Sequence, residues 1–228
     1  MQIYSTYGIG VQQGIKCGVY AKAGYGKTLL MSTAPNPIIL SAESGLLSLS
    51  RFRLPYIPIN NVNDLTAAHQ WALSSREARQ FQTICIDSGS EIAEVVLSNA
   101  KGQVKDARLA YTELLEKMTM TIRAFRDLQG FNVVISAKQE FIKDEHTGVM
   151  KNMPSFPGKQ LTRDFPYFFD ELFQIDIGKL PDQTEYRFLR TQPDFSNEAK
   201  DRSGMLDPIE EPNLTKLFAK INRVNGPR

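Results

Sequence analysis

The chain has little of several features that mark whole classes of protein. It holds two cysteines and two histidines, and Cys17 and Cys85 both lie in apolar segments, which predicts buried thiols in a reducing compartment. The two histidines have no metal-binding partners at ligand spacing. No apolar run approaches the roughly 20 residues that span a membrane, and the amino terminus lacks a signal-peptide pattern. The sequence therefore predicts a cytoplasmic protein with no membrane association.

An excess of charge of one sign is also missing. Lys and Arg number 27 against 25 Asp and Glu, so the formal net charge is only +2. Such a chain has no global basic field, and any contact with nucleic acid must come from local patches. The 228 residues, of which 42% are hydrophobic, suffice for a sizeable core. We expect a single domain over residues 1–228.

Short apolar segments alternate with helical segments along most of the chain. Strands are expected at 15–20, 37–43, 55–59, 82–87 and 132–137. Helices are expected from Gly26, at 63–75 with Asn63 as the N-cap, at 91–100, at 106–129 and at 213–224. This alternation predicts an α/β fold, with a mainly parallel sheet and helices on both faces.

Two later segments do not follow the alternation of strands and helices. Residues 171–192 contain two alternating runs around a Pro-Asp-Gln turn, which predicts a C-terminal antiparallel hairpin at the edge of the sheet. Residues 138–168 are charged and contain three prolines. Loops of that length inside a compact domain are usually functional or disordered, so we expect a long mobile loop there.

The stretch Ala21-Lys-Ala-Gly-Tyr-Gly-Lys-Thr28 has the spacing of a phosphate-binding P-loop, with alanine in place of the usual first glycine. Exposed backbone N–H groups in such a loop surround the phosphates, and the following helix points its N-terminus at them. Lys27 would reach the β- and γ-phosphates, and Thr28 would ligate Mg²⁺. The alternative is a chance glycine turn, but the apolar strand before it and the helix after it favour the P-loop. The expected ATP contacts are Ala23, Gly24, Tyr25, Gly26, Lys27, Thr28 and Leu29.

Two acidic residues follow neighbouring strands of the expected sheet. Asp87 ends "TICID" and would hold the Mg²⁺ ion, unless it only caps the next helix. Glu43 ends "ILSAE" at the edge where open parallel sheets place their ligands. It could orient a water molecule towards the γ-phosphate, or it could be a solvated loop residue.

These residues together resemble the RecA-core ATPases. The resemblance implies that "ILSAE" ends in the catalytic Glu43 and that "ICIDS" carries the Asp87 that holds magnesium. It also implies that "VVISAKQ" ends in a γ-phosphate sensor, which would be Ser136 or Gln139. The cofactors would be ATP and Mg²⁺, and the reaction would convert ATP and water to ADP and phosphate.

The segment 198–204, "EAKDRSG", resembles an element of RecA-core rings and filaments. The resemblance implies that Lys200 and Arg202 reach across a subunit boundary to the γ-phosphate of a neighbour. An arginine placed in this way can raise the rate by roughly 10³–10⁵. The implied assembly is a homo-oligomer, a ring or a filament, with shared ATP sites. The alternative is an exposed charged turn.

A narrower resemblance is to phage-encoded RecA-like single-strand annealing ATPases. It rests on "AKDRSG" near the end of a short core and on a glycine-containing "SFPGK" loop. It implies a recombination protein that binds single-stranded DNA and promotes annealing in the cytoplasm of the host cell. A single-strand-binding protein is a further candidate partner.

The segment 138–168 carries the residues expected to contact DNA: Lys151, Phe156, Lys159 and Arg163. Cations for the backbone and aromatic rings for base stacking suit single-stranded DNA without sequence choice, and DNA would then stimulate ATP hydrolysis. A lid or a subunit contact is the alternative role for this segment. The alternative function is an AAA-type ATP-dependent switch or helicase loader that acts on a protein partner.

Overall fold

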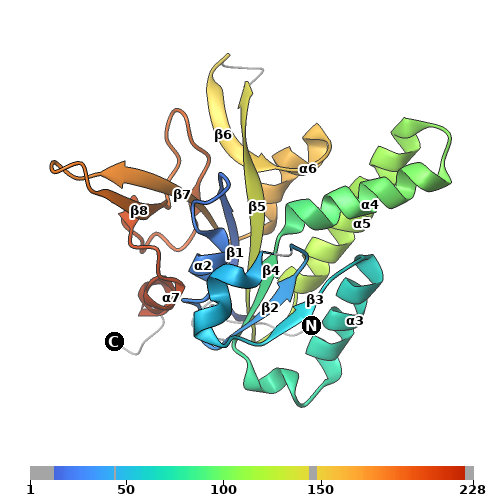
Figure 1. The fold of residues 1–228 in the computed structure, drawn as a ribbon, viewed down its shortest axis with the longest axis horizontal. Helices are drawn as coiled ribbons and strands as arrows, with labels where there is room; N and C mark the ends of the chain where they lie inside the picture. Colours follow the sequence, from blue (N-terminus) through green and yellow to red (C-terminus); the bar gives the residue numbers. More distant parts are fainter. Residues whose placement is uncertain (1–12, 44, 144–147, 224–228) are drawn as a thin grey trace, which may run out of the picture.

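One mixed sheet forms the centre of the molecule (Figure 1). The computed structural model describes residues 13–43, 45–143 and 148–223. The sheet has the order β10-β8-β7-β1-β5-β4-β2-β3, with β6 added beside β5 and β9 beside β7. The strands are β1 (Lys16–Ala21), β2 (Pro37–Ser41), β3 (Tyr56–Pro58), β4 (Thr83–Asp87), β5 (Asn132–Lys143), β6 (Met150–Ser155), β7 (Glu171–Lys179), β8 (Glu185–Arg190), β9 (Lys200–Asp201) and β10 (Ile209–Glu210).

Six strands of this sheet run parallel to their neighbours, in the order β7-β1-β5-β4-β2-β3. Every residue of β1, β2 and β4 is buried, as expected for parallel strands that are covered on both faces. The pairs β5/β6, β7/β8, β7/β9 and β8/β10 are antiparallel. The expected α/β class, the mainly parallel sheet and the C-terminal hairpin are therefore confirmed.

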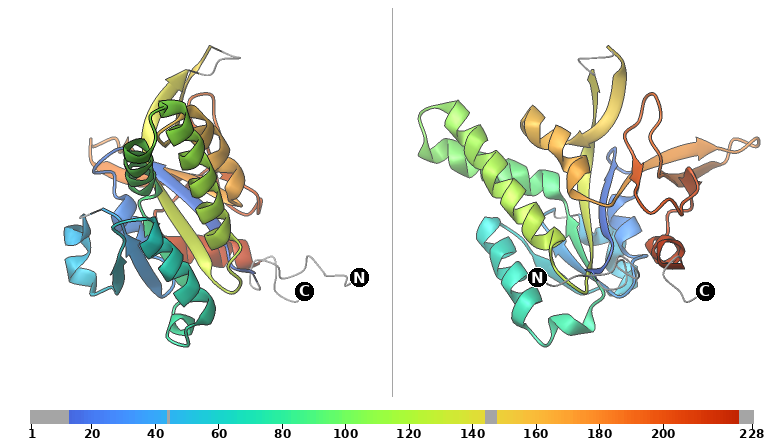
Figure 2. Two further views of the ribbon diagram at one scale, coloured as in Figure 1. Left: turned by 90° about the vertical axis from the view of Figure 1, so that its right-hand side faces the viewer. Right: turned by 180° about the vertical axis from the view of Figure 1, so that it is seen from behind.

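Helices cover both faces of this sheet (Figure 2). On one face lie α3 (Val62–Ser74), α4 (Gly89–Gln103), α5 (Ala107–Arg126), α6 (Lys159–Asp164) and the 3-10 turn η3 (Phe165–Phe168). On the other face lie α2 (Lys27–Met31), the 3-10 helix η1 (Leu46–Phe52) and α7 (Leu214–Asn222). A short 3-10 turn, η2 (Ala78–Gln80), leads into β4. Alternate residues of the central strands supply the two cores, which is the period of a strand.

The two cysteines lie in the second of these cores. Cys17 on β1 and Cys85 on β4 are free thiols with no exposed surface, which confirms that they are buried. Burial raises the pKa of both thiols above the usual range. Within the described residues, no helix is long and apolar enough to cross a membrane.

The N-terminus of α3 differs from the expectation. The N-cap is Asn61, whose side chain accepts hydrogen bonds from the backbone N–H groups of Asn63 and Asp64. The Asp64 carboxylate in turn accepts from the backbone of Asn61, which completes a capping box. The prediction of Asn63 as the N-cap was therefore wrong. Asn61 and Asn63 are close together in the sequence, and the capping box with Asp64 identifies Asn61 as the cap.

Residues 138–168 form mostly strands and helices. The expectation of a long mobile loop there was therefore wrong. β5 continues to Lys143 and pairs with β6 in register from Lys138–Ser155 to Lys143–Met150. This β5–β6 hairpin extends beyond the rest of the sheet (Figures 1 and 2). Pro154 is tolerated in β6 because an edge strand needs fewer ladder donors. Residues 144–147 of the expected loop lie outside the described part.

Candidate active site

The P-loop stretch joins β1 to α2 at the carboxyl end of the parallel strands. Gly24 and Gly26 have φ angles of +79° and +100°, which L-residues with a side chain rarely adopt. Gly26 is the N-cap of α2 and makes no side-chain cap hydrogen bond. The first-turn amides of α2 are therefore left for a ligand, and a phosphate group fits that need.

Lys27 is half-buried over this loop. Its Nζ donates to the carbonyl oxygens of Ala21 at 3.2 Å and Lys22 at 3.4 Å. Burial lowers the pKa of Lys27, and the charges of Glu43 and Asp87 act in the opposite direction. The lysine ammonium thus lies within the electrostatic reach of both carboxylates that the sequence placed in the site.

Asp87 connects three elements of the site. Its Oδ2 accepts from Thr28 Oγ1 at 2.6 Å, and its Oδ1 accepts from Ser136 Oγ at 2.6 Å. The N-cap of α4 is Ser88, whose Oγ accepts from the backbone N–H of Glu91, so Asp87 does not serve as a helix cap. A carboxylate and a hydroxyl side by side are oxygen ligands of the type that Mg²⁺ prefers. Thr28 and Asp87 therefore fit the metal that a P-loop nucleotide would bring.

Glu43 lies directly beside Asp87. β2 and β4 are neighbours, with Ser41 opposite Asp87. The backbone N–H groups of Ala42 and Glu43 both donate to the Asp87 carbonyl oxygen, and Ser88 Oγ donates to Glu43 Oε1 at 2.5 Å. These bonds hold Glu43 against the β4–α4 turn, so the fold brings it together with Lys27, Thr28 and Asp87.

The two sensor candidates occupy different environments. Ser136 is buried and its hydroxyl is used by Asp87. Gln139 lies three residues further along β5, with its amide donating to Asn152 Oδ1 at 2.8 Å and accepting from Gln174 Nε2 at 3.3 Å. These hydrogen bonds link Gln139 sideways to β6 and β7. Its contact with a nucleotide stays a prediction.

The two cations of the segment 198–204 lie in different environments: Lys200 points into the chain and Arg202 is largely exposed. Lys200 Nζ donates to the carbonyl oxygens of Pro166 and Phe169 within the same chain, and burial lowers its pKa. Lys200 is therefore bound within its own chain, and its expected contact with the γ-phosphate of a neighbour stays a prediction. Arg202 keeps 63% of its side chain exposed and pairs with Asp170 at 2.9 Å.

A basic cavity of about 730 Å³ lies between the β5–β6 hairpin, α6 and the segment that leads into β9. We call it the basic cavity because most of its charged lining is cationic: Lys143, Lys151, Lys159, Arg163 and Lys200, with Glu198 as the single carboxylate among its lining residues. Lys151 pairs with Glu198 at 2.5 Å. The structure thus brings together three of the four residues that the sequence assigned to DNA.

Phe156, the fourth residue that the sequence assigned to DNA, is not among the residues that line the basic cavity. Phe156 is only 6% exposed and packs against Phe165 in the core, so its expected position on a stacking surface was wrong. Tyr167 instead lines the basic cavity and is 80% exposed. Lys159 and Arg163 are four residues apart, on one face of α6, and Tyr167 follows four residues later on η3. This four-residue spacing is visible in the sequence and could have indicated Tyr167 as the exposed ring. The alternation of cations and phenylalanines indicated Phe156 instead.

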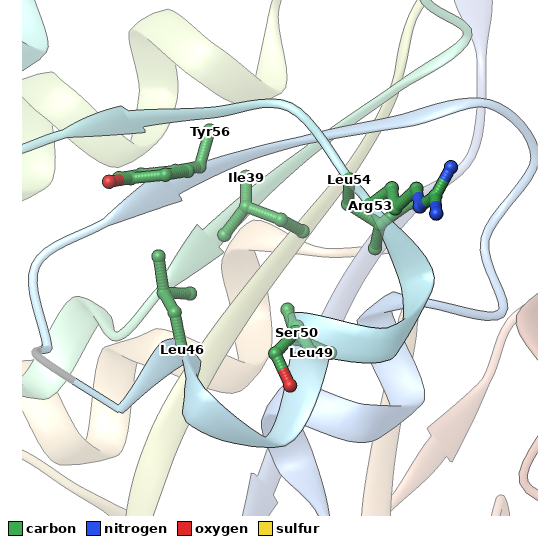
Figure 3. A pocket seen from close by; sticks show the side chains of 7 residues that line it. All are labelled: Ile39, Leu46, Leu49, Ser50, Arg53, Leu54 and Tyr56. Carbon is green, nitrogen blue, oxygen red and sulfur yellow. The ribbon is translucent and has the colours of Figure 1, made fainter.

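A second, smaller cavity is mostly apolar (Figure 3). Its volume is about 160 Å³. Side chains of η1 and of the neighbouring strands line it, and most of them are aliphatic: Ile39, Leu46, Leu49, Ser50, Arg53, Leu54 and Tyr56. It contains none of the residues of the candidate active site, and Arg53 is the one charged residue in its lining.

Comparison with known proteins decides the family. A family model described as an AAA domain matches residues 13–203. The chain belongs to this AAA domain family. The match includes the P-loop, Glu43, Asp87 and Arg202, and the AAA domain is therefore a P-loop ATPase domain with a site for a nucleotide.

Other comparisons are more distant. A KaiC-like protein from the archaeon Pyrococcus horikoshii OT3 is 12% identical, with 79% of this chain and 82% of that chain covered and a TM-score of 0.43. An ATPase from the type III secretion system of pathogenic bacteria is 13% identical, with 74% and 55% covered and a TM-score of 0.45. No curated protein sequence was found to match.

Replacement of Asp87 by asparagine tests the metal part of this AAA domain. Asparagine keeps the size of the side chain but loses the charge that would hold Mg²⁺, so we expect ATP turnover to fall about 100-fold. The Mg²⁺ concentration that gives half-maximal rate should also rise. Steady-state phosphate release over a Mg²⁺ titration measures both. Asp182→Asn, in the exposed hairpin turn, is the matched control, and equal rates for the two variants would contradict the assignment.

Proposed function

We propose that this AAA domain is a RecA-type ATPase that binds single-stranded DNA and promotes annealing in phage recombination. The observation that carries the proposal is the basic cavity, which lies at the end of the same strand that contributes Ser136 to the active site.

The chemistry of the basic cavity suits a nucleic-acid strand. Lys159, Arg163 and Tyr167 lie on consecutive turns of α6 and η3, and Lys143 and Lys151 come from the facing hairpin. Cations neutralise the phosphate backbone, and an exposed ring offers a surface on which any base can stack. A site of this type binds without sequence choice, as annealing requires.

The walls of the basic cavity are connected to the P-loop strand and to α4 by hydrogen bonds. Tyr20 on β1 is buried, and its hydroxyl donates to the carbonyl oxygens of Asn152 on β6 and of Glu198. Ser90 at the start of α4 donates to the Ser155 carbonyl oxygen and accepts from the backbone N–H of Lys138. A change at the nucleotide that moves β1 or α4 would therefore also move a wall of the cavity.

Replacement of Lys159 by alanine tests the DNA part of the proposal. Each neutralised phosphate on a single strand contributes about 0.7 to the slope of log K against log salt. We therefore expect the slope to fall by about 0.7, measured by anisotropy of a labelled oligonucleotide over a salt series. Lys216→Ala, on α7 and paired with Glu211, is the matched control and should keep the wild-type slope.

Replacement of Tyr167 by alanine separates stacking from charge in the same assay. Loss of one stacked base should weaken binding about tenfold at every salt concentration, with an unchanged slope. If Lys159→Ala keeps the wild-type slope and Tyr167→Ala the wild-type affinity, the basic cavity is not the DNA site.

A further inference from the structure

A second arginine lies beside the P-loop, in the same subunit. β8 is antiparallel to β7, and its Leu189 is buried in the core on the α2 face of the sheet. Arg187 is two residues earlier on β8 and therefore points to the same face. A Cβ atom built on Gly26 would lie 3.4 Å from both Cδ and Nε of Arg187. The stem of this arginine thus lies over the last glycine of the loop, directly before Lys27.

The charge of Arg187 is not used inside the described part of the chain. The side chain is exposed, and it has no hydrogen bond or ion pair with any described residue. Neighbouring arginines differ, since Arg190 pairs with Asp194 at 2.7 Å and Arg202 pairs with Asp170 at 2.9 Å. An arginine that pairs with no carboxylate of the described residues, and whose stem lies over Gly26, adds positive charge to a loop whose lysine already favours an anion.

We propose that Arg187 contacts the phosphate chain of the bound nucleotide in cis. The guanidinium would extend past Gly26 and donate charge-assisted hydrogen bonds to phosphate oxygens from the side opposite Asp87 and Glu43. Its planar fork can bind two oxygens at once, which a lysine cannot. This contact rests on the proposed nucleotide site. It is separate from Arg202, which would act on the site of a neighbouring subunit.

Affinity for nucleotide tests this contact directly. We compare wild type, Arg187→Met and Arg187→Lys by displacement of a fluorescent ATP analogue, with ATP and with inorganic tripolyphosphate as competitors. The matched control is Lys179→Met, an exposed cation on β7 of the same hairpin that pairs with Glu185. Arg187→Met should weaken ATP about tenfold or more, as expected for loss of a charge-assisted hydrogen bond. Tripolyphosphate should weaken by the same factor, and Arg187→Lys should lose less.

The outcomes separate this inference from the nucleotide site itself. If wild type binds the analogue and Arg187→Met retains wild-type affinity for both competitors, Arg187 has no role and the P-loop site stands. If ATP weakens but tripolyphosphate does not, the contact is to the nucleoside and the proposed phosphate contact is wrong. If wild type binds no nucleotide, the proposed site and the Arg187 contact fail together.

Discussion

Replacement of Lys27 by alanine is expected to lower ATP turnover on the order of 1,000-fold. The ammonium group lies over the P-loop between loop carbonyl oxygens and near two carboxylates. In that position it can stabilise the negative charge that develops on the transferred phosphoryl group, and the remaining amides of the loop cannot replace a full charge. Steady-state phosphate release at saturating ATP and Mg²⁺ is the measurement.

The control for Lys27→Ala is a lysine of the same kind elsewhere. Lys117 is half-exposed on α5 and pairs with Glu113 at 2.5 Å, so Lys117→Ala should hydrolyse ATP at the wild-type rate. Both variants should retain the wild-type melting temperature within a few degrees, because neither side chain fills the core. Undiminished hydrolysis by Lys27→Ala would remove the P-loop from the reaction.

Replacement of Arg202 by alanine is expected to lower turnover by roughly 10³-fold while nucleotide binding stays close to wild type. We propose that Arg202 acts on the site of a neighbouring subunit in a homo-oligomer. Its side chain is largely exposed and held by a single ion pair to Asp170. Surface ion pairs of this kind are weak, so the arginine can exchange Asp170 for a phosphate group of the neighbour.

Subunit mixing distinguishes action in trans from action in cis. An Arg202→Ala subunit has an intact P-loop, and a Lys27→Ala subunit has an intact Arg202, so a mixture forms some interfaces with both parts. We expect the mixture to recover measurable turnover, although each variant alone is inactive. Arg126→Ala, which loses a comparable exposed pair with Asp127, should be active without mixing. A mixture as inactive as its components would argue against a shared site.

The sequence predicts those site residues whose positions depend on local spacing or on the end of a strand. The P-loop needs glycines at fixed spacing between a strand and a helix, and the positive φ angles of Gly24 and Gly26 meet that need. Asp87 ends a buried strand and Glu43 follows another by two residues, and parallel strands place such ends at one edge. Their meeting with Lys27 therefore follows from the alternation of strands and helices.

Residues whose position depends on distant packing could not be predicted in this way. Arg187 reaches Gly26 only because β8 pairs with β7, and β7 in turn pairs with β1, which leads into the P-loop. Phe156 reads as an exposed aromatic among cations, but Phe165 and α6 fold over it. The β5–β6 hairpin was missed because its proline, Pro154, and its charges are typical of loops, and an edge strand accepts both.

The inward position of Lys200 also depends on packing against residues that are distant in the sequence. Lys200 and Arg202 are two residues apart, which would place them on one face of an extended segment, and from sequence both could extend outwards. The carbonyl oxygens of Pro166 and Phe169 compete for the lysine and hold it inside. Lys200 therefore supports η3, which carries Tyr167 into the basic cavity.

The most direct test of the account is steady-state ATP hydrolysis with and without single-stranded DNA, over a range of protein concentrations. If the AAA domain is a RecA-type ATPase with shared sites, DNA will raise the rate and turnover per subunit will increase with protein concentration. A single-strand-binding protein can then be added to test its effect. A rate indifferent to both DNA and concentration would contradict the account and would indicate a self-contained nucleotide switch that acts on a protein partner.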